Sequence, residues 1–219
     1  MSDKHAVIEK IRDAFARNEY PGDDFLQGSF EGCEPDEEVS PFRGKRDWQS
    51  LEADFLDAHA SALSFFSEAG LRFFLPAYLI ADLNGRLKAA DPLFHLTHGF
   101  FEITVKIPTR SRVFVVRSGH SVFVNPRRYG AATFYDYARY RLSVFTREEA
   151  GAIVGYLRFK HESGQNTSDK AEIDAALSLF WLEREQSAPL AESLKQHLAE
   201  QEEYHAAIRS DTQASHSEP

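Results

Sequence analysis

Apolar residues recur at helical spacing along much of the chain, and polar segments rich in proline and glycine separate these stretches. The first stretch covers residues 4–17, and its apolar positions lie three or four residues apart: Val7, Ile8, Ile11, Ala14 and Phe15. Such a period is typical of an amphipathic helix with one buried face. The pattern therefore predicts a helix over residues 4–17 that ends before Tyr20-Pro21-Gly22.

Two further helices are expected between Trp48 and Gly85. The first begins near Trp48 and carries its apolar side chains on one face: Leu51, Phe55, Leu56 and Leu63. The second begins after Ser67, whose hydroxyl suits an N-cap. Because Pro76 lies well inside this second pattern, we expect it to kink the helix or to split it. Asn84-Gly85 is a stop signal.

After Gly99 the pattern changes to short runs rich in Val, Ile and Phe: FFEITVKI, RVFVVR and HSVFV. These residues favour strands. Ser118-Gly119 fits a two-residue hairpin turn between the second and third runs. The sequence thus predicts a three-stranded antiparallel β-meander around residues 100–125, inserted into a mainly helical chain, and the expected fold class is α+β.

Helical patterns resume after this insert. Thr146 and Glu149 match a capping box at the start of a helix with a buried apolar stripe. Ser168 is a candidate cap for the next helix, and a last helix is expected after Pro189. We expect one domain over residues 1–209, with the β-insert at about 100–130, and a disordered tail at residues 210–219.

Residues 19–46 are rich in proline, glycine and acids, and they predict a long loop. This segment holds the single cysteine, Cys33, followed by four carboxylates: Glu34, Asp36, Glu37 and Glu38. Neighbouring negative charges oppose a thiolate, so Cys33 is disfavoured as a nucleophile. Clustered oxygens are ligands for a hard cation such as Ca²⁺, but the spacing differs from an EF-hand loop. A solvated acidic loop is the expectation.

The formal net charge of the 219-residue chain is −9, and it is unevenly distributed. Residues 1–60 hold 15 acidic and 7 basic residues, and residues 148–219 hold 14 acidic and 6 basic residues. Residues 61–102 have a net charge of −1. Residues 103–147, in contrast, hold 9 basic residues and 1 acidic residue. A basic segment therefore lies inside an acidic chain.

The basic segment and the acidic loop supply the candidate binding residues, which are Arg110, Arg112, Arg117, Arg127, Arg128, Asp36, Glu37 and Glu38. Arginines interleaved with aromatic residues are one means of binding single-stranded nucleic acid. Pairing of the basic segment with acidic helices of the same chain, or of a second copy, is favoured instead. The acidity of the whole chain opposes affinity for nucleic acid.

The sequence HLTH, from His95 to His98, is a weak candidate for a metal site. Side chains at positions i and i+3 share a helix face and can chelate one ion. The spacing and the following residue differ from the HExxH motif of zinc proteases, and His98 precedes Gly99, so the pair is expected at a helix end or in a turn. No cofactor is expected.

An ordered set of motifs resembles a family of uncharacterised, mostly bacterial proteins. These motifs are FRGKRDW, LSFFSEAGLRFFLPAYLIADL, DPLFHLTHGF, RLSVFTREEAGAIVGYLRFK and ALSLFW, within roughly residues 5–185. The LPAYL-like and SVFTxEE-like segments are the most specific. The resemblance implies a common fold and brings no catalytic residues.

No catalytic motif stands out, and the function expected first is that of an acidic, soluble, non-enzymatic protein-binding module, of the immunity or inhibitor type. Its expected partner is a basic protein or a second copy, because acidic patches steer basic partners. A metal-dependent enzyme using His95, His98 and the acids of residues 31–38 is the alternative, and nucleic-acid binding through residues 103–147 is a further one. The apolar stretch FFLPAYLIADL is too short to span a membrane, and a cytoplasmic location is expected.

Overall fold

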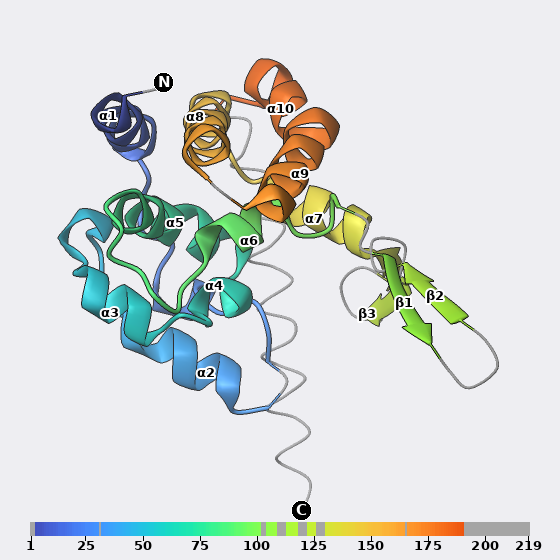
Figure 1. Cartoon of the computed structure of the whole chain (residues 1–219). Helices are drawn as coiled ribbons and strands as arrows, with labels where there is room; N and C mark the ends of the chain where they lie inside the picture. The colour runs from blue at the N-terminus through green and yellow to red at the C-terminus, as the bar shows by residue number, and fades with distance from the viewer. Residues whose placement is uncertain are drawn as a thin grey trace, which may run out of the picture. The chain divides into compact units, whose positions relative to one another are not determined.

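A computed structural model describes most of the chain (Figure 1). The described residues are 3–30, 32–101, 104–108, 113–117, 122–125, 130–164 and 166–190, and side chains are described outside residues 102–132. The chain divides into two compact units. Unit 1 comprises residues up to Lys10, Leu93–Ser143 and Arg147–Ala188, and unit 2 comprises Ile11–Pro92, Val144–Thr146 and the chain from Pro189 onward. The single domain over residues 1–209 stays a prediction, and residues 210–219 lie outside the described residues.

Unit 2 consists of helices joined by short connections. Helix α1, Lys4–Phe15, enters it from unit 1, and the remaining elements are η1 (Asp23–Phe25), α2 (Glu34–Val39), η2 (Ser40–Phe42), η3 (Trp48–Ser50), α3 (Ala53–Ala58), α4 (Ala62–Phe65) and α5 (Glu68–Leu83). The first helix thus lies where the apolar period predicts it, with Ile11 and Phe15 fully buried. Two other predictions are wrong in part. The 19–46 loop contains α2, and the helix expected from Trp48 is divided into η3, α3 and α4.

Helix α5 supplies more buried side chains to the core of unit 2 than any other helix described in that unit. The Ser67 side chain accepts a hydrogen bond from the backbone N–H of Gly70, as the predicted cap requires. The helix continues through Pro76 and is therefore not split, and it ends at Leu83. Phe42 packs at the centre of an aromatic cluster, with ring centroids 4.9 Å from both Phe66 and Phe74.

A backbone junction joins the segment after η1 to the start of α5. The Gly28 N–H donates to the carbonyl of Phe65 at 2.7 Å, and the Ser67 N–H donates to that of Leu26 at 2.7 Å. A Cβ atom on Gly28 would lie 2.6 Å from the Phe66 carbonyl oxygen. Glycine is therefore needed here because two backbones approach closely.

Unit 1 contains the remaining elements. Their bounds are α6 (Pro92–Thr97), β1 (Thr104–Pro108), β2 (Val113–Arg117), β3 (Val122–Asn125), β4 (Gly130–Thr133), α7 (Phe134–Leu142), α8 (Arg147–Ser163), α9 (Thr167–Ala176), η4 (Leu177–Trp181) and α10 (Leu182–Ser187). Helix α8 packs against α9 and α10 (Figure 1). Helix α8 begins directly after Thr146, as predicted, whereas α9 is capped by Asn166 and not by Ser168.

The predicted fold class is wrong, because the described chain is mainly helical and a three-stranded meander is absent from its described residues. Strands β1 and β2 form one antiparallel pair, and β3 pairs separately with β4. Strand propensity indicates which residues are extended, but it does not select the partner strand. β4 has the sequence GAAT, which lacks the β-branched and aromatic run that the prediction relied on.

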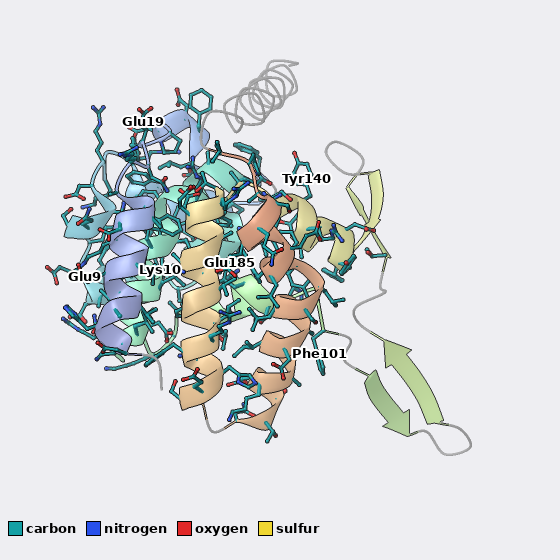
Figure 2. All side chains as sticks on the ribbon, turned by 90° about the horizontal axis from the view of Figure 1, so that it is seen from above. Glu9, Lys10, Glu19, Phe101, Tyr140 and Glu185 are labelled. Carbon is teal, nitrogen blue, oxygen red and sulfur yellow. The ribbon has the colours of Figure 1, made fainter. Side chains whose placement is uncertain are left out.

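The π-helix η4 connects α9 to α10 and turns two large side chains toward the core of unit 1. The Trp181 indole N–H donates to the carbonyl of Leu96 at 2.9 Å, and the Phe180 ring stacks on Phe100 with centroids 5.2 Å apart. On the other side of α8, the Lys10 ammonium donates to the carbonyl of Gly151 at 2.7 Å, in the region that Figure 2 labels. Within the described residues, the helices all fall short of the length and apolar character that a membrane crossing requires.

Candidate functional site

The HLTH histidines lie at the end of α6, as predicted. His95 is in the last turn, and His98 follows the helix, with its backbone N–H donating to the carbonyl of Phe94 at 2.8 Å. The His98 ring stacks on Phe94 with centroids 4.5 Å apart, and the edge of Phe134 approaches it at 5.5 Å. His98 is therefore held between two phenyl rings, in a packing role.

Burial sets the protonation state of both imidazoles. It lowers the pKa of His95 to about 3, with smaller contributions from the charges of Arg141 and His98, and it also lowers the pKa of His98. Both rings are thus neutral at neutral pH. Among the residues with described side chains, however, no three His, Cys, Asp or Glu groups gather in a way that would hold a metal ion. The two histidines belong to unit 1, and the acids of residues 31–38 belong to unit 2.

Helix α7 follows directly, and a capping box begins it. The Thr133 side chain accepts a hydrogen bond from the N–H of Asp136, and the Asp136 carboxylate accepts one from the N–H of Thr133 at 3.2 Å. Its buried face consists of Ala138 and Leu142. The cap and this short apolar stripe leave the polar and aromatic residues of FYDYARYRL on the outer sides of the helix.

Two tyrosine–arginine pairs lie on α7 at i, i+4 spacing. Arg139 Nη1 donates to the Tyr135 hydroxyl at 2.9 Å, and Arg141 Nη1 donates to the Tyr137 hydroxyl at 3.5 Å. The Arg139 guanidinium also lies 5.5 Å from the centroid of the Tyr135 ring. The 2.9 Å bond holds the Arg139 side chain against the Tyr135 ring, whereas the 3.5 Å contact of Arg141 is at the long limit of a hydrogen bond.

Exposed aromatic side chains accompany these pairs. Phe94 of α6 is 46% exposed, and Tyr140 of α7, which Figure 2 labels, is 37% exposed. We call the set the α7 surface, and it consists of Phe94, Tyr135, Tyr137, Arg139, Tyr140 and Arg141. The two tyrosine–arginine pairs lie on different flanks of the helix, with Arg139 near Glu183 of α10 and Arg141 near His95 of α6. The members of the α7 surface all belong to unit 1, and His98 contacts both Phe94 and Phe134, which joins α6 to the first turn of α7.

Arg184 of α10 lies close to this surface. Its Nη2 donates to the carbonyl of Ser143 at 2.9 Å, just after α7 ends. Burial lowers the pKa of Arg184, and the charge of Arg139 lowers it further, which places the two guanidinium groups within electrostatic reach of each other. The negative charge of Glu183 raises the pKa of both Arg139 and Arg184. This corner of unit 1 therefore holds two guanidinium groups together with the carboxylates of Glu183 and Asp136.

The acids predicted as binding residues lie on and beside α2. Asp36 and Glu37 are exposed, and Asp36 forms an ion pair with Arg43 at 2.8 Å. Glu38 is half-buried, and among the described residues its Oε2 has no hydrogen-bond partner. Cys33, which is exposed, directly precedes the helix. The expected solvated loop is thus a short exposed helix.

Other acids of the first third accept hydrogen bonds from backbone amides. The Asp57 carboxylate accepts from the N–H groups of Lys88, Ala89 and Ala90 at 2.8–3.0 Å. Asp23 accepts from the Gly44 N–H at 2.8 Å and from the Tyr20 hydroxyl. Burial, and next the bond to Asp23, raises the pKa of Tyr20 to about 12. Part of the negative charge therefore fixes loops of unit 2.

The structure does not test the arginines that the sequence predicts as binding residues. Arg110, Arg112, Arg127 and Arg128 lie outside the described residues. Arg117 pairs with Thr104 through the β1–β2 ladder, and its side chain is outside the description. The arginines that the structure does place together, Arg139 and Arg141, were not in the predicted site. The repeated Tyr-x-x-x-Arg spacing is the signal in the sequence that could have identified them.

No family model matches the chain, and no curated protein or solved structure matches it either. The resemblance to a family of uncharacterised bacterial proteins consequently stays a prediction.

Proposed function

We propose that the chain is a non-enzymatic protein-binding module and that the α7 surface is its contact site. The observation that carries the proposal is the exposure of the Phe94 and Tyr140 rings beside α7, a helix on which exposed Arg139 pairs with half-buried Tyr135. Tyrosine and arginine are enriched among the residues that dominate the binding energy of protein interfaces.

The ordering of these side chains further supports a binding role. Immobilising a long side chain costs roughly 0.5–1.5 kcal/mol on association. Arg139 is already held by Tyr135, so less of this cost remains at binding. A capped helix supports both pairs, which makes the surface more regular than a loop site.

The partner and the location belong to the same proposal. The expected partner is still a basic protein or a second copy. A second copy suits the α7 surface better, because it carries exposed carboxylates such as that of Glu37 on α2. The proposal also includes an immunity-type or inhibitor role and a cytoplasmic location. The alternative metal site is less favoured, since His95 and His98 are not joined by a third His, Cys, Asp or Glu ligand among the described side chains.

Affinity capture with a matched pair of variants tests the proposal. The immobilised chain, its Phe94→Ser/Tyr140→Ser variant and a Leu179→Ser/Leu190→Ser control are incubated with lysate of the source organism. Leu179 and Leu190 are 45% and 56% exposed and lie outside the α7 surface. We expect the wild type and the control to retain one or more proteins that the Phe94→Ser/Tyr140→Ser variant does not retain. Direct binding is then measured with the purified proteins. The proposal fails if the retained proteins are the same for all three chains.

A further inference from the structure

We propose that residues 18–23 form a strap that closes the proline turn of helix α5, with the Asn18 side chain supplying the hydrogen bond that Pro76 cannot make. The strap and α5 both belong to unit 2, so this inference is independent of the binding proposed for the α7 surface of unit 1. It accounts for a helix that continues through a proline which the sequence predicts as a kink or a break.

Proline removes one hydrogen bond from the interior of a helix. Pro76 has no backbone N–H, and the carbonyl that would accept from this position, four residues earlier, is that of Arg72. The proline ring also crowds this carbonyl, which is why proline is the least favourable residue inside a helix. Helix α5 nevertheless runs unbroken over 16 residues, Glu68–Leu83. A donor from outside the helix can offset the loss.

Asn18 provides such a donor. Its Nδ2 atom donates to the Arg72 carbonyl at 3.1 Å, although the two residues are 54 positions apart in the sequence. The backbone N–H of Asn18 donates to the carbonyl of Phe15 at 3.1 Å, and the Phe15 side chain is fully buried. The end of α1 therefore fixes the position of the Asn18 amide, which replaces the N–H that is missing at position 76.

Tyr20 holds the strap against the same turn of α5. The Tyr20 ring makes edge-to-face contacts with Phe73 and Phe74, with centroid distances of 5.3 Å and 6.3 Å. Such contacts stabilise a pair of rings beyond the area that they bury. Phe73 and Phe74 directly follow Arg72 in the sequence. The strap thus contacts three consecutive residues of α5, one by a hydrogen bond and two by ring packing.

The far end of the strap is fixed to the segment that follows η2. The Gly44 N–H donates to the Asp23 carboxylate at 2.8 Å and to the Tyr20 hydroxyl at 3.1 Å. The Tyr20 hydroxyl in turn donates to the Asp23 carboxylate. The strap is therefore anchored at both ends, and the bond from Asn18 to Arg72 is the anchor that acts directly on the proline turn.

Hydrogen–deuterium exchange followed by mass spectrometry tests the inference on the full chain. Asn18→Ala should speed amide exchange in peptides from α5 roughly threefold to tenfold, the change expected from the loss of one hydrogen bond. Peptides from α9, which belongs to unit 1, should exchange as in the wild type. Glu19→Ala changes the exposed neighbour that Figure 2 labels, and this matched control should leave exchange in α5 unchanged.

A double-mutant cycle with Pro76 separates hydrogen bonding from packing. Pro76→Ala restores a backbone N–H that can donate to the Arg72 carbonyl. In that background Asn18→Ala should speed exchange in α5 by less than about twofold, because the helix then makes its own bond. An equal effect in both backgrounds overturns the inference. Unchanged exchange in α5 after Asn18→Ala, or equal acceleration in α9, also overturns it.

A second variant keeps the test decisive if Pro76→Ala fails to fold by circular dichroism. Asn18→Asp retains the size of the side chain but replaces its N–H donors with a carboxylate, which only accepts hydrogen bonds. Exchange in α5 should then accelerate at least as much as in Asn18→Ala. Exchange like that of the wild type would show that the side chain acts through its shape, and the inference would fall. These outcomes leave the capture test of the α7 surface unaffected.

Discussion

Replacing Gly28 and Gly155 by alanine should change the stability of the protein in opposite directions, because the surroundings of the two glycines differ. A Cβ on Gly28 would lie 2.6 Å from the Phe66 carbonyl oxygen and 2.9 Å from the Ser67 Cα, both backbone atoms that move only with the chain. We expect Gly28→Ala to destabilise the protein by about 1–3 kcal/mol, the usual cost of overpacking. Urea unfolding followed by circular dichroism measures this.

Gly155, in the interior of α8, is the matched control. The atom nearest to a Cβ built there is Cδ of Lys10 at 3.9 Å, which is an ordinary contact with a flexible side chain. Gly155→Ala should therefore stabilise the protein by roughly 0.5–1 kcal/mol, because alanine loses less backbone entropy in a helix. The same direction of change in both variants would contradict the packing described for Gly28.

At the scale of single residues, the sequence predicts local roles better than it predicts a site. The position of His95 and His98 at a helix end follows from the adjacent Gly99, whose φ is 93°. Their surroundings do not follow, because Phe134 reaches His98 only through the fold. Tyr137 and Arg141 could have been paired from spacing alone, whereas the approach of Arg184 depends on tertiary packing.

The N-cap of α5 is an element-scale feature with a direct test. Ser67 accepts a hydrogen bond from the Gly70 N–H at 3.0 Å and donates to the Phe25 carbonyl at 2.5 Å. Loss of a serine cap costs about 0.5–2 kcal/mol. We expect the loss for Ser67→Ala to fall at the upper end of this range, because the substitution also removes the hydrogen bond from the Ser67 hydroxyl to the Phe25 carbonyl. Ser64→Ala, at an exposed position of α4, should change the urea midpoint little; a comparable effect would argue against the cap.

Asp57 connects α3 to the segment before α6 and makes the stability of unit 2 depend on pH. The backbone N–H groups of Ala90, Ala89 and Lys88 hold the pKa of its carboxyl below the ordinary value. The folded state therefore favours the ionised carboxylate. Its contribution to the free energy of unfolding is complete above about pH 4, the ordinary pKa of an aspartate, and is lost as the pH falls through the lower pKa of the folded state.

Asp57→Asn should therefore lower the urea midpoint at about pH 7, and the difference from the wild type should shrink toward about pH 3. The difference shrinks because protonation of the Asp57 carboxylate removes the negative charge from the wild type, and the variant lacks this charge at every pH. Asp54→Asn, an exposed neighbour on α3, serves as the control and should show little effect at either pH. A difference that stays constant with pH would assign Asp57 a role independent of its charge.

Element prediction succeeded where local chemistry determines the outcome. The start of α5 at Ser67 and its end before Gly85, whose φ is 67°, follow from cap and turn residues. Helix α2 was missed because Pro35 indicated a loop, although proline is well suited to the first turn of a helix. The pairing of β3 with β4 was missed because GAAT lacks strand-favouring residues, although the two strands are neighbours in the sequence. The π-helix at Leu177–Trp181 places Trp181 against Leu96, a long-range contact that periodicity does not show.

At the scale of the whole molecule, segregation of charge raises the question of what the acids pair with. Residues 11–92, the main part of unit 2, hold 16 acidic and 8 basic residues, a net charge of −8. Some of these acids accept backbone hydrogen bonds, as Asp23 and Asp57 do, and Asp36 pairs with Arg43 within the same segment. These interactions position loops of unit 2 but leave a compact unit with excess like charge.

The effect of salt on the urea midpoint distinguishes charge repulsion within the units from pairing between the acidic and basic parts of the chain. Because like charges in a compact unit repel and added ions screen them, we expect the urea midpoint to rise between roughly 10 mM and 300 mM NaCl. KCl should act equally, since the effect depends on ionic strength and not on one ion. If the basic 103–147 segment instead neutralised the acidic helices of its own chain, the same screening would weaken attraction, and the midpoint would fall.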